Sequence, residues 1–266
     1  MLYALQTDKL AIKRIKEDKE IPYMIDPSAG SGTFLIEYMK FITENMKYRN
    51  RNANGYNAEL GTARAVKDKV LSDWFYPDHR ENKWAQTYIY GSEINFNLGT
   101  ATKVNMILHG DGSTNIFVKD GLLPFSKYEK ETAPNAMKGS DEDALYQNRE
   151  VNGQFDLILT NPENLFIERW YQLLRENGRL AAVLPESVFD TTENKYIRLF
   201  LYKYFKIKAV VSLPQLAFEP YTSTKTSILF AQKKTKAEVK EWNTLWEEAS
   251  SDWQKLKVRV ENLIAV

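Results

Sequence analysis

The chain has 266 residues, of which 43% are hydrophobic and 27% charged, and its formal net charge is +1. This length suits one large α/β domain with appendages, and the near-neutral charge means that any nucleic-acid-binding face depends on local segregation of charge. The sequence has no cysteine and two histidines, which excludes disulfides and a cysteine nucleophile and argues against a metal centre. No apolar run approaches the ~18 residues that span a bilayer, so we expect a cytoplasmic protein without membrane contact.

Short apolar segments alternate with helical patterns along the chain. The first strand candidate is 21–25, and Phe34, Tyr38, Phe41 and Ile42 follow it at helical spacing, which predicts a helix with one buried face. Further strand candidates are 87–93, 155–160, 179–185, 207–214 and 226–232. Strands that alternate with helices indicate a mainly parallel sheet covered on both faces.

A second helical stripe lies between two of these strands. It is formed by Phe166, Trp170, Leu173 and Leu174. The Glu-Asn-Gly at 176–178 supplies a glycine at which we expect this helix to stop.

Three segments interrupt or end this alternation. Residues 44–60 and 126–154 are polar, and we expect both to be surface insertions, either solvated loops or DNA-facing segments. From 234 to 266, tryptophans and leucines recur at roughly helical spacing. We interpret this last segment as a packing helix that follows a core of residues 1–233, either within this chain or as part of a larger partner surface.

The strongest local pattern is MIDPSAGSGTFL at 24–35. An apolar strand brings Asp26 to its carboxyl end, where ligands bind in open α/β sheets, and Gly30 and Gly32 let a ligand approach the backbone closely. The pattern is not a P-loop, because no lysine precedes Thr33, and it lacks the third glycine of a dinucleotide fingerprint. A helix-capping turn without a ligand is the alternative.

This stretch resembles the cofactor motif of N6-adenine DNA methyltransferases, particularly the methylation subunits of type I restriction-modification systems. Three later stretches resemble further motifs of that family in the same order: 91–112, 155–162 and 217–230. The resemblance implies a Rossmann-like fold dependent on S-adenosylmethionine (AdoMet), with a seven-stranded, mostly parallel sheet and helices on both faces.

The resemblance also implies a set of cofactor-binding residues. Glu93 would accept hydrogen bonds from the ribose hydroxyls, Asp111 from the adenine amino group, and Asp26 would lie near the methionine end. An ordinary surface glutamate and a turn-forming Asp-Gly are the alternatives for the first two. The complete predicted set is Asp26, Pro27, Ser28, Ala29, Gly30, Gly32, Thr33, Glu93, Ile94, Asp111 and Gly112.

Three residues are implied for methyl transfer. The side chain of Asn161 and the main-chain carbonyl of Pro162 would hold both protons of the target amine for direct attack on the sulfonium methyl, which is positioning and electrostatics without a covalent intermediate. The base would leave the double helix and stack on an aromatic side chain. Phe218 matches that position, although a core phenylalanine is nearly as good an explanation.

The chain departs from the family after Pro162. The family continues with a second proline and an aromatic residue, whereas here Glu163 and Asn164 follow. The family's phenylalanine-rich segment before the first strand is also missing. Either the natural protein has further residues between 162 and 163 that form a mobile catalytic loop, which we favour, or the chain is an inactive paralogue.

We therefore predict a site-specific DNA adenine-N6 methyltransferase that uses AdoMet and acts on double-stranded DNA. We expect it to be the modification subunit of a restriction-modification system, with a separate specificity subunit and a possible restriction subunit as partners. The first alternative is a catalytically inactive DNA-binding or assembly subunit. The second is a methyltransferase that acts on protein glutamine or RNA.

Overall fold

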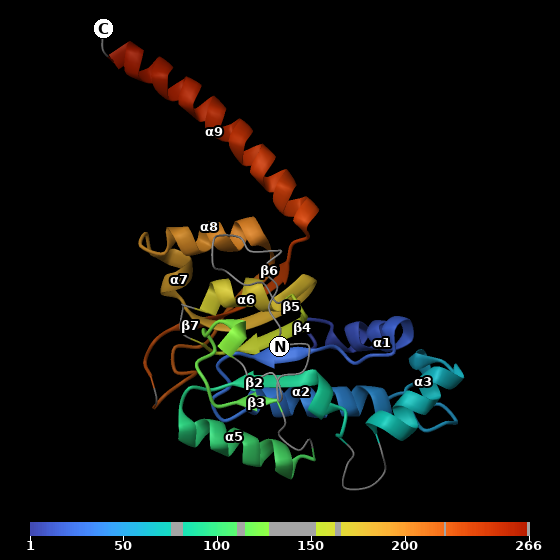
Figure 1. The fold of residues 1–266 in the computed structure, drawn as a ribbon. Coiled ribbons are helices and arrows are strands. Elements are labelled where there is room, and N and C mark those ends of the chain that lie inside the picture. Colours follow the sequence, from blue (N-terminus) through green and yellow to red (C-terminus); the bar gives the residue numbers. More distant parts are fainter. Residues whose placement is uncertain (76–81, 111–114, 128–152, 163–165, 221, 265–266) are drawn as a thin grey trace.

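The computed structural model describes residues 1–75, 82–110, 115–127, 153–162, 166–220 and 222–264 (Figure 1). In this part of the chain, seven strands form one sheet in the order β3-β2-β1-β4-β5-β7-β6. The strands are β1 (Met24–Asp26), β2 (Ile89–Ser92), β3 (Ile116–Phe117), β4 (Phe155–Thr160), β5 (Leu174–Pro185), β6 (Phe205–Ser212) and β7 (Thr226–Lys233). Strands β1 to β5 pair in parallel, and β7 runs antiparallel to both β5 and β6.

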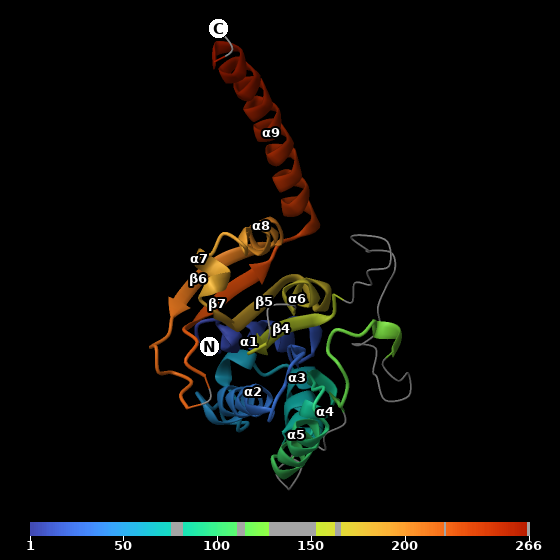
Figure 2. The same ribbon diagram turned by 90° about the vertical axis from the view of Figure 1, so that its left-hand side faces the viewer.

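Helices cover both faces of this sheet, which confirms the predicted layers. Helices α2 and α5 lie on one face, whereas α6, α7 and α8 lie on the other (Figures 1 and 2). The helices are α1 (Thr7–Asp18), α2 (Thr33–Thr43), α3 (Arg64–Asp68), α4 (Ala85–Tyr88), α5 (Phe96–Leu108), α6 (Ile167–Leu173), α7 (Ser187–Asp190), α8 (Lys195–Tyr204) and α9 (Lys236–Ile264). Two π-helical segments are η1 (Glu44–Tyr48) and η3 (Lys69–Trp74), and two 3₁₀ turns are η2 (Ala58–Leu60) and η4 (Phe125–Lys127). Each face therefore has its own apolar core.

All six strand candidates are confirmed, with shifted ends. The sequence reasoning missed β3, a strand of two residues that is too short to show the alternation on which strand prediction depends. Strand β1 lies between β2 and β4, so the chain crosses to the other half of the sheet beside it. The loop that follows β1 and the end of β4 therefore lie at this switch point, where ligands bind in such sheets.

The predicted glycine stop of the second helix is wrong. Helix α6 ends at Leu173, and 176–178 already belong to β5. The buried side chain of Lys233 donates to the carbonyls of Tyr171 and Leu174, both at 2.6 Å. A lysine can cap the last carbonyls of a helix, so this distant residue replaces the expected glycine.

The prediction of a surface excursion at 44–60 also needs correction, because Asn45, Met46, Tyr56, Asn57 and Leu60 are buried. Asparagine side chains satisfy the backbone of this compact segment. The Nδ2 of Asn57 donates to the carbonyl of Asn45 at 2.7 Å, and that of Asn45 to the carbonyl of Phe41 at 2.8 Å. The polar composition thus reflects internal hydrogen bonds rather than solvation. Most of the other predicted insertion, 126–154, lies outside the described residues.

The C-terminal segment is helical, as predicted, and its first turn packs on the core through Val239. Helix α9 leaves the sheet near α8 and projects away from the molecule (Figures 1 and 2). Trp246 is 51% and Trp253 62% exposed. The interpretation of this helix as a packing element of a larger partner surface stays a prediction.

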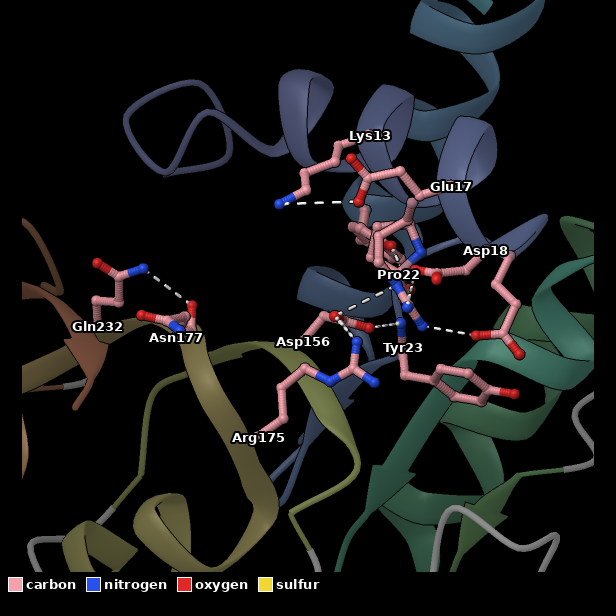
Figure 3. Close-up of polar contacts among 12 residues, drawn as sticks. Lys13, Glu17, Asp18, Pro22, Tyr23, Asp156, Arg175, Asn177 and Gln232 are labelled. Atoms are coloured by element: carbon pink, nitrogen blue, oxygen red, sulfur yellow. Dashed lines mark hydrogen bonds and ion pairs between the residues drawn. The ribbon is translucent and has the colours of Figure 1, made fainter. Parts of the chain in front are cut away.

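A buried ion-pair network joins α1 to the sheet at its amino edge. Asp156, near the start of β4, accepts hydrogen bonds from the backbone N–H of Tyr23 at 2.9 Å and from Nη1 of Arg175 at 2.7 Å (Figure 3). Nε of Arg14 on α1 lies 3.5 Å from the same carboxylate. This network fixes the amino end of the β1–β4 pair.

Candidate functional site

Asp26 ends β1 at the carboxyl edge of the sheet, as predicted. Its carboxylate is 1% exposed and accepts hydrogen bonds from the backbone N–H of Ser28 at 3.0 Å and from the hydroxyl of Thr160 at 2.7 Å. The hydroxyls of Ser28 and Thr160 are 2.9 Å apart. The loop after β1 and the end of β4 are thereby joined through side chains.

Burial dominates the electrostatics of this carboxyl group. It raises the pKa of Asp26 from 3.8 to about 7, while the hydrogen bonds from Thr160 and Ser28 oppose the rise and the nearby charge of Glu93 adds to it. A buried carboxyl without a cationic partner is costly to ionise. Asp26 therefore changes its charge near neutral pH, a property that clusters at functional sites.

Glu93 follows β2 and holds the glycine loop. Its two carboxylate oxygens accept from the backbone N–H groups of Gly30 and Asn95, each at 2.8 Å. The N–H of Ala29 donates to the carbonyl of Ser92 at 2.8 Å. The glycine loop and the acidic residue after β2, which the sequence predicted to share one ligand, are thus in direct contact.

The two glycines of the loop have different surroundings. Gly32 adopts a φ of +81°, and a Cβ there would come within 2.7 Å of the Thr102 side chain. Gly30 adopts a φ of +55°, and no described atom lies within 4 Å of where its Cβ would be. Open space beside a backbone that only glycine adopts easily is what a ligand that contacts the main chain requires, so these residues fit a nucleoside cofactor.

The segment after β3 also borders the site. A Cβ on Gly121 would lie 2.1 Å from the carbonyl oxygen of Pro27, so the chain after β3 packs directly against the loop after β1. Arg169 of α6 donates to the carbonyls of Leu122 and Leu123 at 2.6 and 2.9 Å. Asp120 precedes Gly121 and is half-buried, with one carboxylate oxygen accepting from the N–H of Leu122 at 2.9 Å.

Sequence reasoning missed Asp120, although a signal was present. It comes one residue after an apolar Ile-Phe-Val run, and an acidic residue at the end of an apolar run is the pattern that singled out Asp26. The predicted Asp111 and Gly112 lie outside the described residues and come before β3. The carbonyl of His109 and the side chain of Asn115, which flank them, bond to residues that precede β2.

The predicted catalytic residues follow Thr160 directly. Asn161 is exposed and Pro162 is buried, while Glu163 to Leu165 lie outside the described residues, so the supposed missing loop stays a prediction. Phe218 is partly buried in the segment between β6 and β7. Since Pro185 pairs with Thr226 and Ser212 with Ser227, that segment leaves the sheet at the same edge as Asn161.

The remaining predicted cofactor residues lie at the same edge. Thr33 opens α2, and its hydroxyl is 3.2 Å from that of Ser31. Ile94, which follows Glu93, is 71% exposed. An exposed apolar side chain at this position is available to pack against the adenine ring of a cofactor. Within the described ranges, no cluster of three or more acidic or histidine side chains could hold a metal ion. The helices among the described residues include none that is long and apolar enough to cross a membrane.

Comparison with known proteins matches the chain to one family over nearly its whole length. The family described as N-6 DNA Methylase matches residues 6–264. A type I restriction enzyme MjaVII methylase subunit from Methanocaldococcus jannaschii is 25% identical over 91% of this chain and 37% of its own length. A type I restriction enzyme EcoEI methylase subunit from Escherichia coli is 28% identical over 61% of this chain and 34% of its own length.

The fold has a counterpart among solved structures. A chain from work on complex assembly and conformational transition of the type I R-M system superposes with a TM-score of 0.53 at 20% identity, covering 85% of this chain and 41% of that chain. The chain spans little more than a third of the length of the two curated relatives.

Proposed function

The chain belongs to the N-6 DNA methylase family, and from that premise we propose that it forms the cofactor-binding and catalytic core of an AdoMet-dependent DNA adenine-N6 methyltransferase. The fold is that of AdoMet-dependent methyltransferases. The observation that carries the proposal is the hydrogen bond between Asp26 and Thr160. It joins the glycine loop to the last residue of β4, which Asn161 and Pro162 follow, and this supports one site made from both segments.

The cofactor pocket is assigned from the polar groups around the glycine loop. Glu93 is assigned to the ribose hydroxyls, because its carboxylate follows β2 and contacts the glycine loop at Gly30. Asp120 is our candidate for the adenine amino group in place of Asp111, since it follows β3 as Glu93 follows β2. Asp26 is assigned to the positively charged methionine end, where an ionised carboxylate favours a cation.

The acceptor side is assigned to Asn161, Pro162 and Phe218. When bound, AdoMet supplies the electrophilic methyl group. The side-chain oxygen of Asn161 and the carbonyl of Pro162 accept the two amino protons of adenine, which orients the nitrogen lone pair. Phe218 stacks on the base once it has left the double helix.

A modification subunit of a restriction-modification system is the biological role that we propose, with a specificity subunit and a restriction subunit as partners. The near-neutral net charge supports a separate subunit for DNA sequence recognition. An exposed apolar stripe on α9 supports a protein partner, because its spacing alternates between three and four residues as in a coiled-coil seam. Its exposed part consists of Trp246, Ala249, Trp253, Leu256 and Val260. Val239 and Trp242 continue the same spacing but are partly buried, and Val239 packs against the core.

The test combines cofactor binding with methyl transfer. We expect calorimetry to detect AdoMet binding and labelled AdoMet to methylate adenine in double-stranded DNA. Asn161→Ala should keep cofactor binding and lose transfer by roughly 10²–10³-fold, whereas Asn243→Ala, on α9 away from the sheet, should change neither. Absence of AdoMet binding contradicts the proposal. Binding without transfer favours an inactive subunit, and transfer to peptide or RNA alone favours the second alternative.

A further inference from the structure

Thr160 is the last residue of β4, is fully buried, and precedes Asn161. Its hydroxyl donates to the carboxylate of Asp26 at 2.7 Å and lies 2.9 Å from the hydroxyl of Ser28. A hydroxyl has one proton to donate, so the Ser28 hydroxyl must donate to Thr160. With the bond from the N–H of Ser28 to Asp26 at 3.0 Å, these three residues form a closed hydrogen-bonded ring.

The ring stands where the backbone pairing of β1 and β4 ends. The two strands pair at Met24 with Leu157 and at Ile25 with Ile158. Beyond these pairs, the side chains of Asp26 and Thr160 connect the two strands. Thr160 is therefore the last described link between the cofactor loop and Asn161 before the chain enters the site.

We infer that Thr160 is a positioning residue that sets Asn161 relative to the cofactor loop and stabilises the ionised carboxylate of Asp26. The inference rests on the proposed function, because it assigns Thr160 a role in that same site. Transfer depends on the distance and alignment of the reacting atoms, and a side chain bonded to both halves of the site fixes them. A valine at this position would keep the shape and remove both hydrogen bonds.

The ring also sets the charge of the pocket. Burial raises the pKa of Asp26 to about 7, the hydroxyl of Thr160 lowers it, and Glu93 is the charged neighbour that raises it further. Removing the Thr160 hydroxyl shifts this pKa upward. Because AdoMet is cationic at its sulfonium, its affinity should increase as Asp26 ionises, and the increase should occur at higher pH in Thr160→Val.

The experiment compares wild type, Thr160→Val, Thr160→Ser and Ser28→Ala. AdoMet affinity is measured from about pH 5 to about pH 9, a window that brackets the ionisation of Asp26, and single-turnover methylation is measured at saturating AdoMet and DNA. We expect Thr160→Val to move the midpoint of the affinity profile to higher pH and to lower the saturated rate by roughly tenfold or more. Thr160→Ser, which keeps the hydroxyl, should restore both, and Ser28→Ala should lie between.

Two results would overturn the inference. In the first, Thr160→Val has the wild-type profile and saturated rate. In the second, Thr160→Ser shows the same shifted profile and lowered rate as Thr160→Val, although it keeps the hydroxyl, so the hydroxyl would not account for either effect. If Thr160→Val does not fold, unchanged profiles and rates in Ser28→Ala overturn the inference instead. Failure of wild type to bind AdoMet contradicts the proposed function, a separate outcome.

Discussion

Asp26 and Asp156 are both buried on neighbouring strands. Asp26 lies at the carboxyl end of β1, whereas Asp156 lies near the amino end of β4. Asp156 is surrounded by the guanidinium groups of Arg14 and Arg175 and by a backbone N–H. Asp26 has neutral donors and the carboxylate of Glu93 nearby. A buried charge compensated within the chain holds the fold together, whereas a buried carboxyl left uncompensated is available to a cationic ligand.

The largest effect that this contrast predicts is a loss of stability on substitution of Asp156 at the amino edge. Asp156→Ala leaves Arg14 and Arg175 without their shared carboxylate and the N–H of Tyr23 without its acceptor. We expect a loss of about 3 kcal/mol in the free energy of unfolding, the usual cost of breaking a buried pair. Urea unfolding followed by circular dichroism measures it. AdoMet affinity of the folded protein should stay unchanged.

Asp156→Asn is the matched control. It keeps an acceptor for Tyr23 and loses only the charge, so its loss should be smaller than that of the alanine variant. If Asp156→Ala weakens AdoMet binding at temperatures where the protein is fully folded, then it is wrong to assign stability to the amino edge and cofactor binding to the carboxyl edge.

The second prediction concerns the pH dependence of stability at the carboxyl edge. Asp26 has a folded pKa of about 7, above its ordinary 3.8, so the folded state holds a proton that the unfolded state releases between these values. Stability from this group is present below about pH 4 and is lost as pH rises to about 7. Asp26→Asn, which has no ionisable group there, should lack this decline.

Urea midpoints at pH 5 and pH 8, compared between wild type and Asp26→Asn, test the sign. The same variant should bind AdoMet roughly tenfold more weakly at pH 8, where the wild-type carboxylate is charged, because hydrogen bonds to charged groups are the stronger ones. Equal declines in the two proteins would mean that Asp26 is already ionised at pH 5, and the contrast with Asp156 would disappear.

The two edges also differ in how far the sequence predicts them. Asp26 could be placed at the carboxyl edge because it ends an apolar run, whereas Glu93 was implied by the resemblance to the methyltransferase family. The helix stop at Lys233 and the ring at Thr160 could not be predicted, because each joins residues far apart in sequence. The ion pairs of Asp156 could not be predicted either, because its partner Arg14 lies on α1, far away in sequence.

Local patterns likewise predicted the helices better than their surroundings. The spacing of Trp242, Trp246 and Trp253 correctly indicates a helix with one apolar side, but periodicity does not say what that side contacts. In 44–60 the error was the reverse. Asparagines that read as loop residues serve as internal hydrogen-bonding groups, which composition alone does not distinguish from solvation.

The smallest predicted effect comes from two glycines that share a backbone conformation. Gly30 and Gly55 have φ values of +55° and +86°, and no described atom lies within 4 Å of either Cβ position. Alanine at either position should cost about 1 kcal/mol of unfolding free energy, from the left-handed backbone alone. Only Gly30→Ala should also weaken AdoMet binding, since its methyl group would enter the space between the glycine loop and the ligand. Thermal unfolding and calorimetry on both variants measure these effects, and a wild-type affinity in Gly30→Ala would move the cofactor away from the loop that Glu93 holds.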